Sequence, residues 1–254
     1  MSVYLWLKIV ESMFKKVEIE RFRGIKYASI GELKQVNLFL GKNNCGKSSL
    51  LDALFLATGL SNPLLPINVN IMRGYNKTSL KDLQLNFYNL DSTQPIHICV
   101  ENEEKRNIKI RLFENNKKDV SFDTIDIHSN VIEGEYGLRV NFEINEESFE
   151  SQLRFDVSTT TTIDSPKQYE ESLRCIYLNP KYDFNTSIQG LNNILKNKDE
   201  DFIVEGLRVI EPRVKDFIFT EEGIFIDMGL EKRIPINVMG DGIRKIVSLL
   251  TVIY

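Results

Sequence analysis

The amino-acid sequence predicts an α/β fold in which a glycine-rich loop joins a strand to a helix and a block of antiparallel strands follows. A short apolar run at residues 36–40 precedes the glycine-rich stretch 41–48, and apolar residues recur at helical spacing directly after it. From about residue 95 to 157, apolar and polar residues alternate with the period of two that is typical of half-buried strands. At 254 residues the chain is long enough for one large domain or a domain with a subdomain.

The glycine-rich stretch Gly41-Lys42-Asn43-Asn44-Cys45-Gly46-Lys47-Ser48 fits the phosphate-binding pattern G-x-x-x-x-G-K-[ST]. Glycines let backbone N–H groups curl around phosphate oxygens, and the N-terminus of the following helix adds the positive end of its dipole. We expect Lys47 to reach the β- and γ-phosphates and the Ser48 hydroxyl to bind Mg²⁺. An accidental glycine turn is the alternative, and the flanking elements argue against it. The candidate binding residues are Gly41, Asn43, Asn44, Cys45, Gly46, Lys47, Ser48 and Ser49.

The cysteines indicate the redox compartment of the protein, and its net charge limits its binding partners. Cys45, Cys99 and Cys175 are scattered and odd in number, which is typical of a reducing compartment without a disulfide framework or zinc spacing. Cys45 is either a redox-sensitive thiol or, as we favour, a small filler at a variable loop position. The net charge of −4 argues against a wholesale electrostatic grip on nucleic acid, and no apolar run is long enough to span a bilayer. We expect a cytoplasmic protein that does not bind membranes.

The first strand is predicted around Val17, Ile19 and Phe22, whose spacing is that of a half-buried strand. Residues 1–12 precede it as an extension, either a short amphipathic helix or a start-site artefact before Met13. After the glycine-rich loop, a helix is predicted from apolar residues that end at a glycine. The residues that define it are Leu50, Leu51, Leu54, Phe55 and Gly59.

Residues 60–94 contain two prolines and many asparagines, and they predict a long irregular connection. Four short strands separated by polar turns follow, which together predict an antiparallel meander with one solvent-facing side. Lys109 and Arg111 share that outward side. A nucleic-acid patch is one interpretation, and a solvated strand face is the one we favour. The residues that alternate in the four strands are Ile96, Ile98 and Val100; Ile108, Ile110 and Leu112; Leu138, Val140, Phe142 and Ile144; and Leu153, Phe155 and Val157.

The last third of the chain combines helices with a hairpin. Residues 174–180 predict a buried strand stopped by Pro180, and the region from about 186 to 210 predicts two amphipathic helices. A hairpin is predicted around the turn Glu221-Glu222-Gly223. The turn Gly240-Asp241-Gly242 then opens a helix that is apolar nearly all round and is therefore expected to be buried.

These motifs and their order resemble the first part of an ABC/SMC-type ATPase head. More narrowly, they resemble the AAA-type ATP-binding proteins grouped with the OLD (overcoming lysogenization defect) family. The resemblance covers nearly the whole chain from Met13, so residues 13–254 are expected to form one such head. The loop is specific to P-loop NTPases generally, whereas each other segment is weak alone. The matching segments are Glu18–Ile25, Gly41–Ser48, Leu85–Asn89 and Pro235–Arg244.

The resemblance implies that ATP and Mg²⁺ bind between two heads, so a homodimer or larger oligomer is expected. The loop of one head would hold ATP, and Gly240, Asp241 and Gly242 of the other would close over the γ-phosphate. Transporters of this type carry a serine where this chain has Met239, so a hydroxyl contact is missing there. By resemblance Arg23 contacts a phosphate, with a plain surface arginine as the alternative. Gln84 is a candidate that faces Mg²⁺ or water.

A head of this type also needs an apolar strand that ends in Asp-Glu, where the aspartate supports Mg²⁺ and the glutamate orients the attacking water. The nearest match, Gly223–Asp227, is followed by Met228 and Gly229 and is better explained as part of the hairpin. We therefore assign no catalytic residue. The resemblance implies an incomplete head, truncated before the acidic strand, that binds nucleotide weakly and hydrolyses it poorly alone.

Two functions remain open at this point. The first is an ATPase head that works with DNA or with an effector nuclease in DNA processing or phage defence, which rests on family analogy. The second is a non-hydrolysing regulatory module that supplies its glycine turn to a complete head. A GTPase-like switch is rejected, because Asn197-Lys198-Asp199-Glu200 does not match the base-reading pattern Asn-Lys-x-Asp. His97 and His128 are lone histidines that we expect to be structural or exposed.

Overall fold

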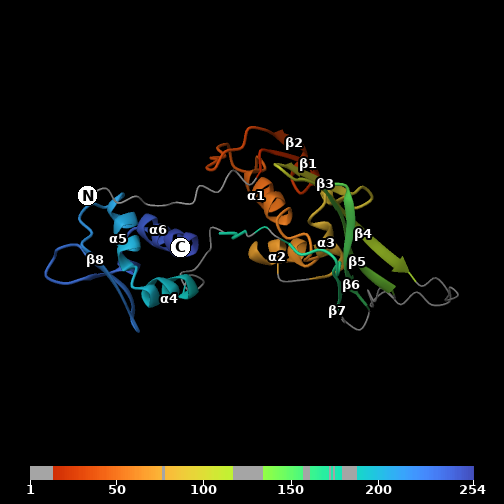
Figure 1. Cartoon of the computed structure of the whole chain (residues 1–254). Helices are drawn as coiled ribbons and strands as arrows, with labels where there is room; N and C mark the ends of the chain where they lie inside the picture. Colours follow the sequence, from red (N-terminus) through yellow and green to blue (C-terminus); the bar gives the residue numbers. More distant parts are fainter. Residues whose placement is uncertain are drawn as a thin grey trace. The chain divides into compact units, whose positions relative to one another are not determined.

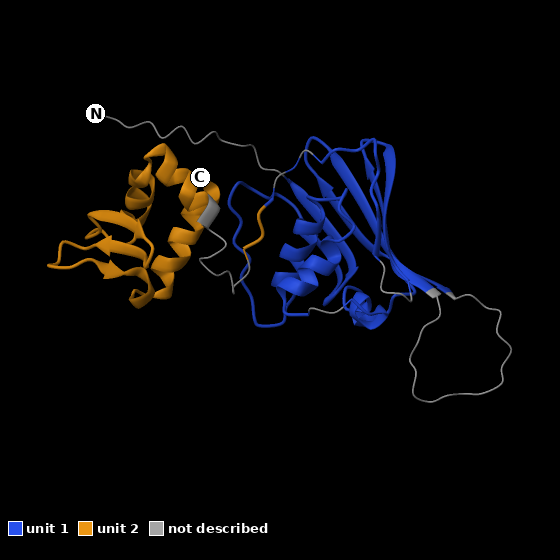
Figure 2. Cartoon of the chain, turned by 90° about the horizontal axis from the view of Figure 1, so that it is seen from below, with its two compact units in different colours: residues 1–175 blue, residues 176–254 orange. Residues whose placement is uncertain are grey.

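The computed structural model describes residues 14–75, 78–116, 134–156, 161–171, 173, 175–178 and 188–254. The chain divides into two compact units, Met1–Cys175 and Ile176–Tyr254, hereafter unit 1 and unit 2 (Figure 2). The predicted extension 1–12, His128 and Val157 lie outside the described residues. Each unit has its own hydrophobic core and is described by itself.

Unit 1 is built on one seven-stranded sheet in the order β2-β1-β3-β4-β5-β6-β7 (Figure 1). Every neighbouring pair is antiparallel, and consecutive strands from β3 to β7 lie side by side. The predicted meander is therefore confirmed. The strands are β1 (Lys16–Phe22), β2 (Ile25–Ile30), β3 (Ile96–Glu101), β4 (Lys105–Asn116), β5 (Gly134–Ile144), β6 (Glu147–Phe155) and β7 (Thr161–Asp164).

The first strand belongs to the same sheet as the meander, which the sequence did not indicate. Strand β1 forms a hairpin with β2 on one side and pairs with β3 on the other, with Val17 opposite Val100 and Ile19 opposite Ile98. About 75 residues separate β1 from β3 along the chain, and no local pattern encodes so distant a pairing. The antiparallel strands thus form one continuous layer with the strand that precedes the loop region.

One face of this sheet is buried. Its apolar residues form a single core with helix α1 (Lys47–Leu56), which lies across the face (Figure 1). The alternation along β1 shifts between Ile19 and Phe22, because Arg21 has a φ of 58° and the residue after it turns inward. This shift explains why three buried residues of β1 are spaced by two and then by three.

The connection over residues 60–94 is not irregular, and that prediction was wrong. It contains α2 (Leu65–Met72), α3 (Leu80–Gln84) and a 3₁₀ turn, η1 (Tyr88–Leu90). Helix α3 begins with a capping box in which Ser79 and Asp82 exchange hydrogen bonds. Both helices are short and are stabilised by apolar side chains that pack into the core of unit 1.

The apolar run before the loop was predicted as a strand, and this prediction was also wrong. Residues 36–40 pair with no strand among the described residues. Val36, Leu38 and Leu40 are 88%, 80% and 81% exposed, whereas Phe39 packs against the core. The alternation typical of a strand is therefore present, but the neighbouring strand that would complete its hydrogen bonds is not found in the described part of the chain.

The predicted buried strand at residues 174–180 is likewise absent over the part that can be checked. Residues 175–178 carry no strand, and Ile176 and Leu178 are exposed. Arg174, Asn179 and Pro180 lie outside the described residues. An apolar run forms a strand only where a partner strand is available, and no strand pairs with this segment within the described residues.

Unit 2 packs three helices against a small three-stranded sheet in the order β10-β9-β8. The hairpin between β8 and β9 is confirmed, and its turn contains Gly223 with a φ of 121°, a conformation that favours glycine. The two predicted amphipathic helices are confirmed. The elements of unit 2 are α4 (Ile188–Asn197), α5 (Glu200–Arg208), β8 (Asp216–Thr220), β9 (Gly223–Asp227), β10 (Ile234–Pro235), η3 (Ile236–Val238) and α6 (Asp241–Ile253).

Helix α6 forms as predicted, but it is not buried all round. Val247, Ser248 and Thr251 are buried, whereas Leu249 and Ile253 are 42% and 60% exposed. Helices α4 and α5 cover one side of α6 and leave the other open within unit 2. No helix in the described part of the chain combines the length and apolar character needed to cross a membrane.

Candidate phosphate-binding site

The glycine-rich loop leads directly into the N-terminus of α1. Gly46 occupies the position before the helix with a φ of 90°, and Asn44 adopts a left-handed φ of 63°. The N–H of Leu50 donates the first helical hydrogen bond, to the carbonyl oxygen of Gly46 at 2.9 Å. The first N–H groups of a helix have no acceptor within it, and they coincide with the positive end of the dipole. The loop therefore leads into a helix N-terminus of the kind that binds anions, and the binding role of its residues stays a prediction.

Two glycines of the loop lie close to neighbouring side chains. A Cβ atom on Gly41 would lie 2.8 Å from the sulfur of Cys45. A Cβ atom on Gly46 would lie 3.3 Å from Cγ1 of Ile25, which follows the turn between β1 and β2. The loop thus curls tightly on itself and also packs against that turn. Cys45 is exposed, and its sulfur lies close to Gly41 within the loop; its role as a filler stays a prediction.

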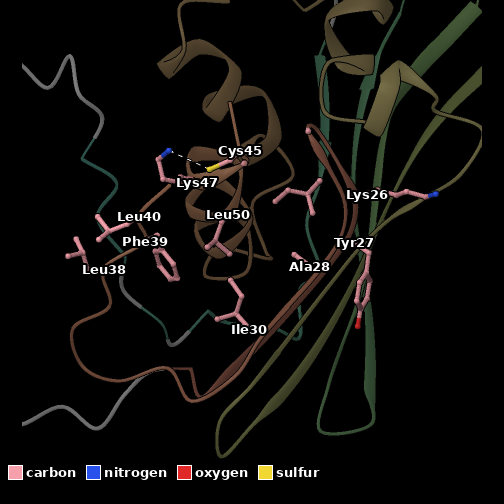
Figure 3. A pocket seen from close by; sticks show the side chains of 13 residues that line it. Lys26, Tyr27, Ala28, Ile30, Leu38, Phe39, Leu40, Cys45, Lys47 and Leu50 are labelled. Carbon is pink, nitrogen blue, oxygen red and sulfur yellow. Dashed lines mark hydrogen bonds between the residues drawn. The ribbon is translucent and has the colours of Figure 1, made fainter. Parts of the chain in front are cut away.

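The lysine of the loop is folded back onto its own backbone. The Nζ atom of Lys47 donates hydrogen bonds to the carbonyl oxygens of Gly41 at 2.8 Å and Lys42 at 2.6 Å. It also lies 3.5 Å from the Cys45 sulfur (Figure 3). Lys47 would have to exchange these carbonyl contacts for phosphate oxygens when it binds an anion. Ser48 is exposed at the start of α1, so its hydroxyl is accessible to a ligand.

A cavity of about 470 Å³ lies beside the loop, which is within the usual size range of ligand pockets. In Figure 3, Phe39 and Leu50 lie between the loop and β2, whereas Lys26 and Tyr27 point away from the loop. The walls come from three segments: the turn and strand β2, the unpaired segment before the loop, and the loop with the start of α1. The lining residues include Gly24, Ile25, Leu38, Cys45, Gly46 and Lys47.

Arg23 lies in the turn between β1 and β2, and its side chain is only 10% exposed, so it is not a plain surface arginine. Its Nη1 atom is 2.8 Å from Oδ2 of Asp52, and its Nη2 atom donates to Oδ1 of Asn70 at 2.5 Å. The backbone N–H of Arg23 donates to the carbonyl oxygen of Asn86 at 2.9 Å. The turn is therefore tied to helices α1 and α2, and the guanidinium contacts Asp52 in the middle of α1 and Asn70 of α2.

Asp52 was not predicted, although it is central to this arrangement. It lies on the buried side of α1, is fully buried, and pairs with Arg23 and with Arg73, whose Nη2 is 2.5 Å from the same carboxylate oxygen. The signal in the sequence was a charged residue inside the otherwise apolar stretch Leu50–Leu56. Arg73, which follows α2, had no comparable signal.

The candidate metal site is less complete. Gln84 is half-buried at the end of α3, and no contact between its side chain and the loop is found among the described residues. The described residues contain no group of three His, Cys, Asp or Glu side chains that could hold a metal ion. The roles of Ser48 and Gln84 toward Mg²⁺ therefore both stay predictions.

The second candidate segment lies in unit 2. Gly240 precedes α6, and Asp241 and Gly242 form its first turn, all three exposed. Arg244 pairs with Asp241 one turn along the helix. Met239 packs against the core of unit 2, so this side chain serves the core. The turn thus offers a free helix N-terminus, and its place in a nucleotide site stays a prediction.

Asp227 is confirmed as a hairpin residue. It ends β9 opposite Asp216 of β8, and its carboxylate accepts a hydrogen bond from the N–H of Gly229 at 2.7 Å. Its carbonyl oxygen accepts one from the N–H of Lys215 at 2.8 Å. Strand β9 pairs antiparallel with β8 on one side and with β10 on the other. Asp227 is therefore occupied in stabilising a turn of unit 2.

Comparison with known proteins supports the assignment of the loop. The chain matches the AAA ATPase domain family over residues 13–254. It is 23% identical over 273 residues to an ATP/GTP phosphatase of Helicobacter pylori, which covers 94% of this chain and 72% of that protein. It is also 44% identical over 46 residues to the uncharacterized protein MJECL10 of Methanocaldococcus jannaschii, which covers 18% of this chain and 21% of that protein. The chain therefore belongs to the AAA ATPase domain family, a family of P-loop NTPases.

Proposed function

We propose that this chain is an ATP-binding head that holds MgATP on the loop Gly41–Ser48. The observation that carries the proposal is the left-handed glycine turn that delivers Lys47 and free N–H groups to the start of α1. The backbone N–H groups would bind phosphate oxygens, Lys47 would neutralise the terminal phosphates, and the Ser48 hydroxyl would bind Mg²⁺. The bound nucleotide would supply the phosphoanhydride bond that an ATPase cleaves.

The finer part of the proposal concerns the kind of head. The order of the segments resembles ABC/SMC-type heads of the OLD family, in which two copies share each nucleotide. The exposed turn at Gly240 is the segment that we propose to close over the γ-phosphate of a partner copy. Its glycines have open space around them, since a Cβ atom on Gly240 or Gly242 would meet nothing within 4 Å. A role with DNA or an effector nuclease in phage defence, in the cytoplasm, rests on the resemblance alone.

A second candidate function is a nucleotide-binding module that does not hydrolyse. It is favoured by the positions of two carboxylates in the described part of the chain. Asp52, close to the loop in sequence, is paired with two arginines, and Asp227 lies in a hairpin. Neither is placed to orient an attacking water. We therefore expect this chain alone to bind nucleotide and to turn it over slowly.

Binding and turnover measurements separate the two functions. Equilibrium titration with MgATP and MgGTP, the two nucleotides in the name of the Helicobacter relative, should show saturable binding that Lys47→Ala weakens by at least about tenfold. Lys42→Ala is the matched control, because it removes an equal charge from the same loop. Absence of binding in the wild type would refute the proposal.

Turnover and size measurements test the finer statements. Steady-state hydrolysis at about 1 s⁻¹ or faster, abolished by Lys47→Ala, would refute the non-hydrolysing candidate. Size-exclusion chromatography with light scattering should show a dimer with MgATP for the wild type and a monomer for Lys47→Ala. A monomer under saturating MgATP would refute the shared site while leaving nucleotide binding intact.

A further inference from the structure

One oxygen of the buried Asp52 carboxylate contacts two arginine side chains. Arg23 Nη1 and Arg73 Nη2 lie 2.8 Å and 2.5 Å from Oδ2 of Asp52. Asp52 is fully buried, Arg23 is nearly so, and Arg73 keeps 34% of its side chain exposed. One arginine is enough to neutralise one carboxylate. The second cation gives this cluster of three side chains a formal charge of +1 close to a loop built for anions.

The turn that carries Arg23 borders the phosphate loop. Gly24 and Ile25, the two residues after Arg23, line the same cavity as Gly46 and Lys47. Ile25 also packs within 3.3 Å of the position that a Cβ on Gly46 would take. Asp52 lies five residues along α1 from Lys47, a rise of about 7.5 Å. The residues that follow Arg23 and the first residues of α1 thus line one cavity, and the Arg23 guanidinium contacts α1 at Asp52.

The backbone of the turn between β1 and β2 adopts an uncommon conformation at Arg23. Arg23 has a left-handed φ of 50°, which is uncommon for a residue other than glycine. A Cβ atom on the following Gly24 would meet nothing within 4 Å, so the turn has open space on that side. Strained backbone of this kind clusters at binding sites and switches. The side chain of Arg23, in contrast, is fixed by Asp52 and Asn70.

The role of Arg73 follows from the need to neutralise the buried charge of Asp52. A buried carboxylate that loses its only cation is strongly destabilising, so Asp52 with one arginine would lock that arginine in place. With Arg73 on the same oxygen, Arg23 can leave Asp52 without stranding the charge. We propose that Arg73 is a positioning residue that releases Arg23: Asp52 holds Arg23 beside the loop in the nucleotide-free chain, and Arg73 keeps Asp52 neutralised when Arg23 turns to a nucleotide phosphate. This inference rests on the proposed nucleotide site.

The test is a double-mutant cycle in the dissociation constant of MgATP. Arg73→Gln should weaken binding about tenfold, the size of one charge-assisted hydrogen bond. Arg73→Lys, which keeps the charge, should restore the affinity to within about twofold of the wild type. In an Arg23→Ala/Asp52→Asn background, which removes the buried charge together with the residue to be released, Arg73→Gln should have no further effect.

Arg21→Gln is the matched control. Arg21 lies two residues before Arg23 and pairs with Asp91 at 2.7 Å, so its replacement removes one arginine and one ion pair from the same segment. Its affinity for MgATP should equal that of the wild type. An equal loss in Arg21→Gln and Arg73→Gln would overturn the proposal, as would an equal loss from Arg73→Gln in the wild type and in the Arg23→Ala/Asp52→Asn background. Wild-type affinity in Arg73→Gln would overturn it as well.

A second measurement detects binding in the wild-type chain and uses a variant only to assign the resonance. The ¹⁵N–¹H resonance of the Arg23 Nε group, assigned with Arg23→Lys, should shift on addition of MgATP, whereas that of Arg21 should not. An unchanged Arg23 resonance at saturation would overturn the inference while leaving nucleotide binding established. A wild-type chain that does not bind MgATP would overturn both the inference and the proposed function.

Discussion

The Nη1 atom of Arg23 lies 2.8 Å from Oδ2 of Asp52, and this ion pair joins the turn between β1 and β2 to helix α1. Because Asp52 is fully buried and Arg23 is almost buried, the pair is shielded from water on both sides. Its contribution is therefore different from that of the exposed ion pairs of unit 1. The residues that follow Arg23 in this turn line the cavity beside the phosphate loop, so the ion pair also connects that wall of the cavity to α1.

Replacing Asp52 should destabilise unit 1 more than any exposed carboxylate would. Asp52→Ala leaves the guanidiniums of Arg23 and Arg73 without their shared counter-charge, and breaking a buried ion pair in this way typically costs about 3–5 kcal/mol. Asp91→Ala, which breaks the more exposed pair with Arg21, should cost much less, because water and salt screen that pair. Urea unfolding followed by the circular dichroism of both variants measures the difference. Equal losses would show that the cluster around Asp52 is no more than a surface network.

A second prediction follows from the left-handed conformation of Gly46. Gly46→Ala forces a Cβ atom into a φ of 90° and brings it within 3.3 Å of Ile25, so we expect a loss of about 1–2 kcal/mol in the stability of unit 1. MgATP binding should weaken too, since the loop can no longer hold its N–H groups in place. Gly31→Ala is the control, because a Cβ there meets nothing within 4 Å. A Gly46→Ala variant as stable as the wild type would contradict the loop geometry.

Close packing in unit 2 gives a third prediction. A Cβ atom on Gly190 of α4 would lie 1.8 Å from the backbone carbonyl oxygen of Thr251 on α6, and backbone cannot move aside as a flexible side chain can. Gly190→Ala should therefore push the two helices apart and destabilise unit 2 by about 1–3 kcal/mol. Gly242→Ala, in open space within α6, should be neutral or stabilising by up to about 1 kcal/mol. Hydrogen exchange of the amides in α4 and α6 locates the effect.

The fourth prediction concerns pH. Partial burial lowers the pKa of His97 below its usual value of 6.5, with a further lowering from Lys109 and Arg111 and a partial opposing effect from Glu20. Because the folded pKa is the lower one, the unfolded chain binds more protons than the folded chain just below pH 6.5. The stability of unit 1 should therefore fall as the pH drops from 6.5 through the folded pKa of His97, and then level off.

The histidine signals measure this directly. The sequence contains two histidines, so ¹H NMR titration with His97→Gln assigns each one. The resonance of His97 should titrate below pH 6.5. In His97→Gln, the part of the pH dependence of unfolding that arises between pH 6.5 and the lower pKa should disappear. A pKa for His97 at or above 6.5 would refute the prediction.

Local patterns in the sequence were enough for the loop and for most elements with a clear period. The pattern Gly41–Ser48 specifies its own geometry, because glycine alone adopts the left-handed turn at Gly46 without cost. The alternation in β3 to β6 specified a meander, since the side-chain period of a strand is two. The amphipathic pattern of α4 and α5 likewise specified two helices, each with one buried face.

Tertiary contacts decided the rest. Residues 36–40 have the alternation of a strand, but a strand needs a partner, and none pairs with them in the described part of the chain. Helices α2 and α3 lack a strong period of their own and form because they pack on the core of unit 1. The cluster of Arg23, Asp52 and Arg73 joins three segments that lie up to 50 residues apart along the chain.

The sequence by itself thus determined what this protein can bind, and the tertiary structure decided how the binding residues are held. A phosphate loop is a local feature, since its N–H groups, its lysine and its helix dipole come from the single continuous stretch Gly41–Leu56. The position of Arg23 depends instead on the burial of Asp52 and on Arg73 reaching the same oxygen. Burial and long-range ion pairing arise only when the chain is folded, because they depend on which surfaces exclude water together.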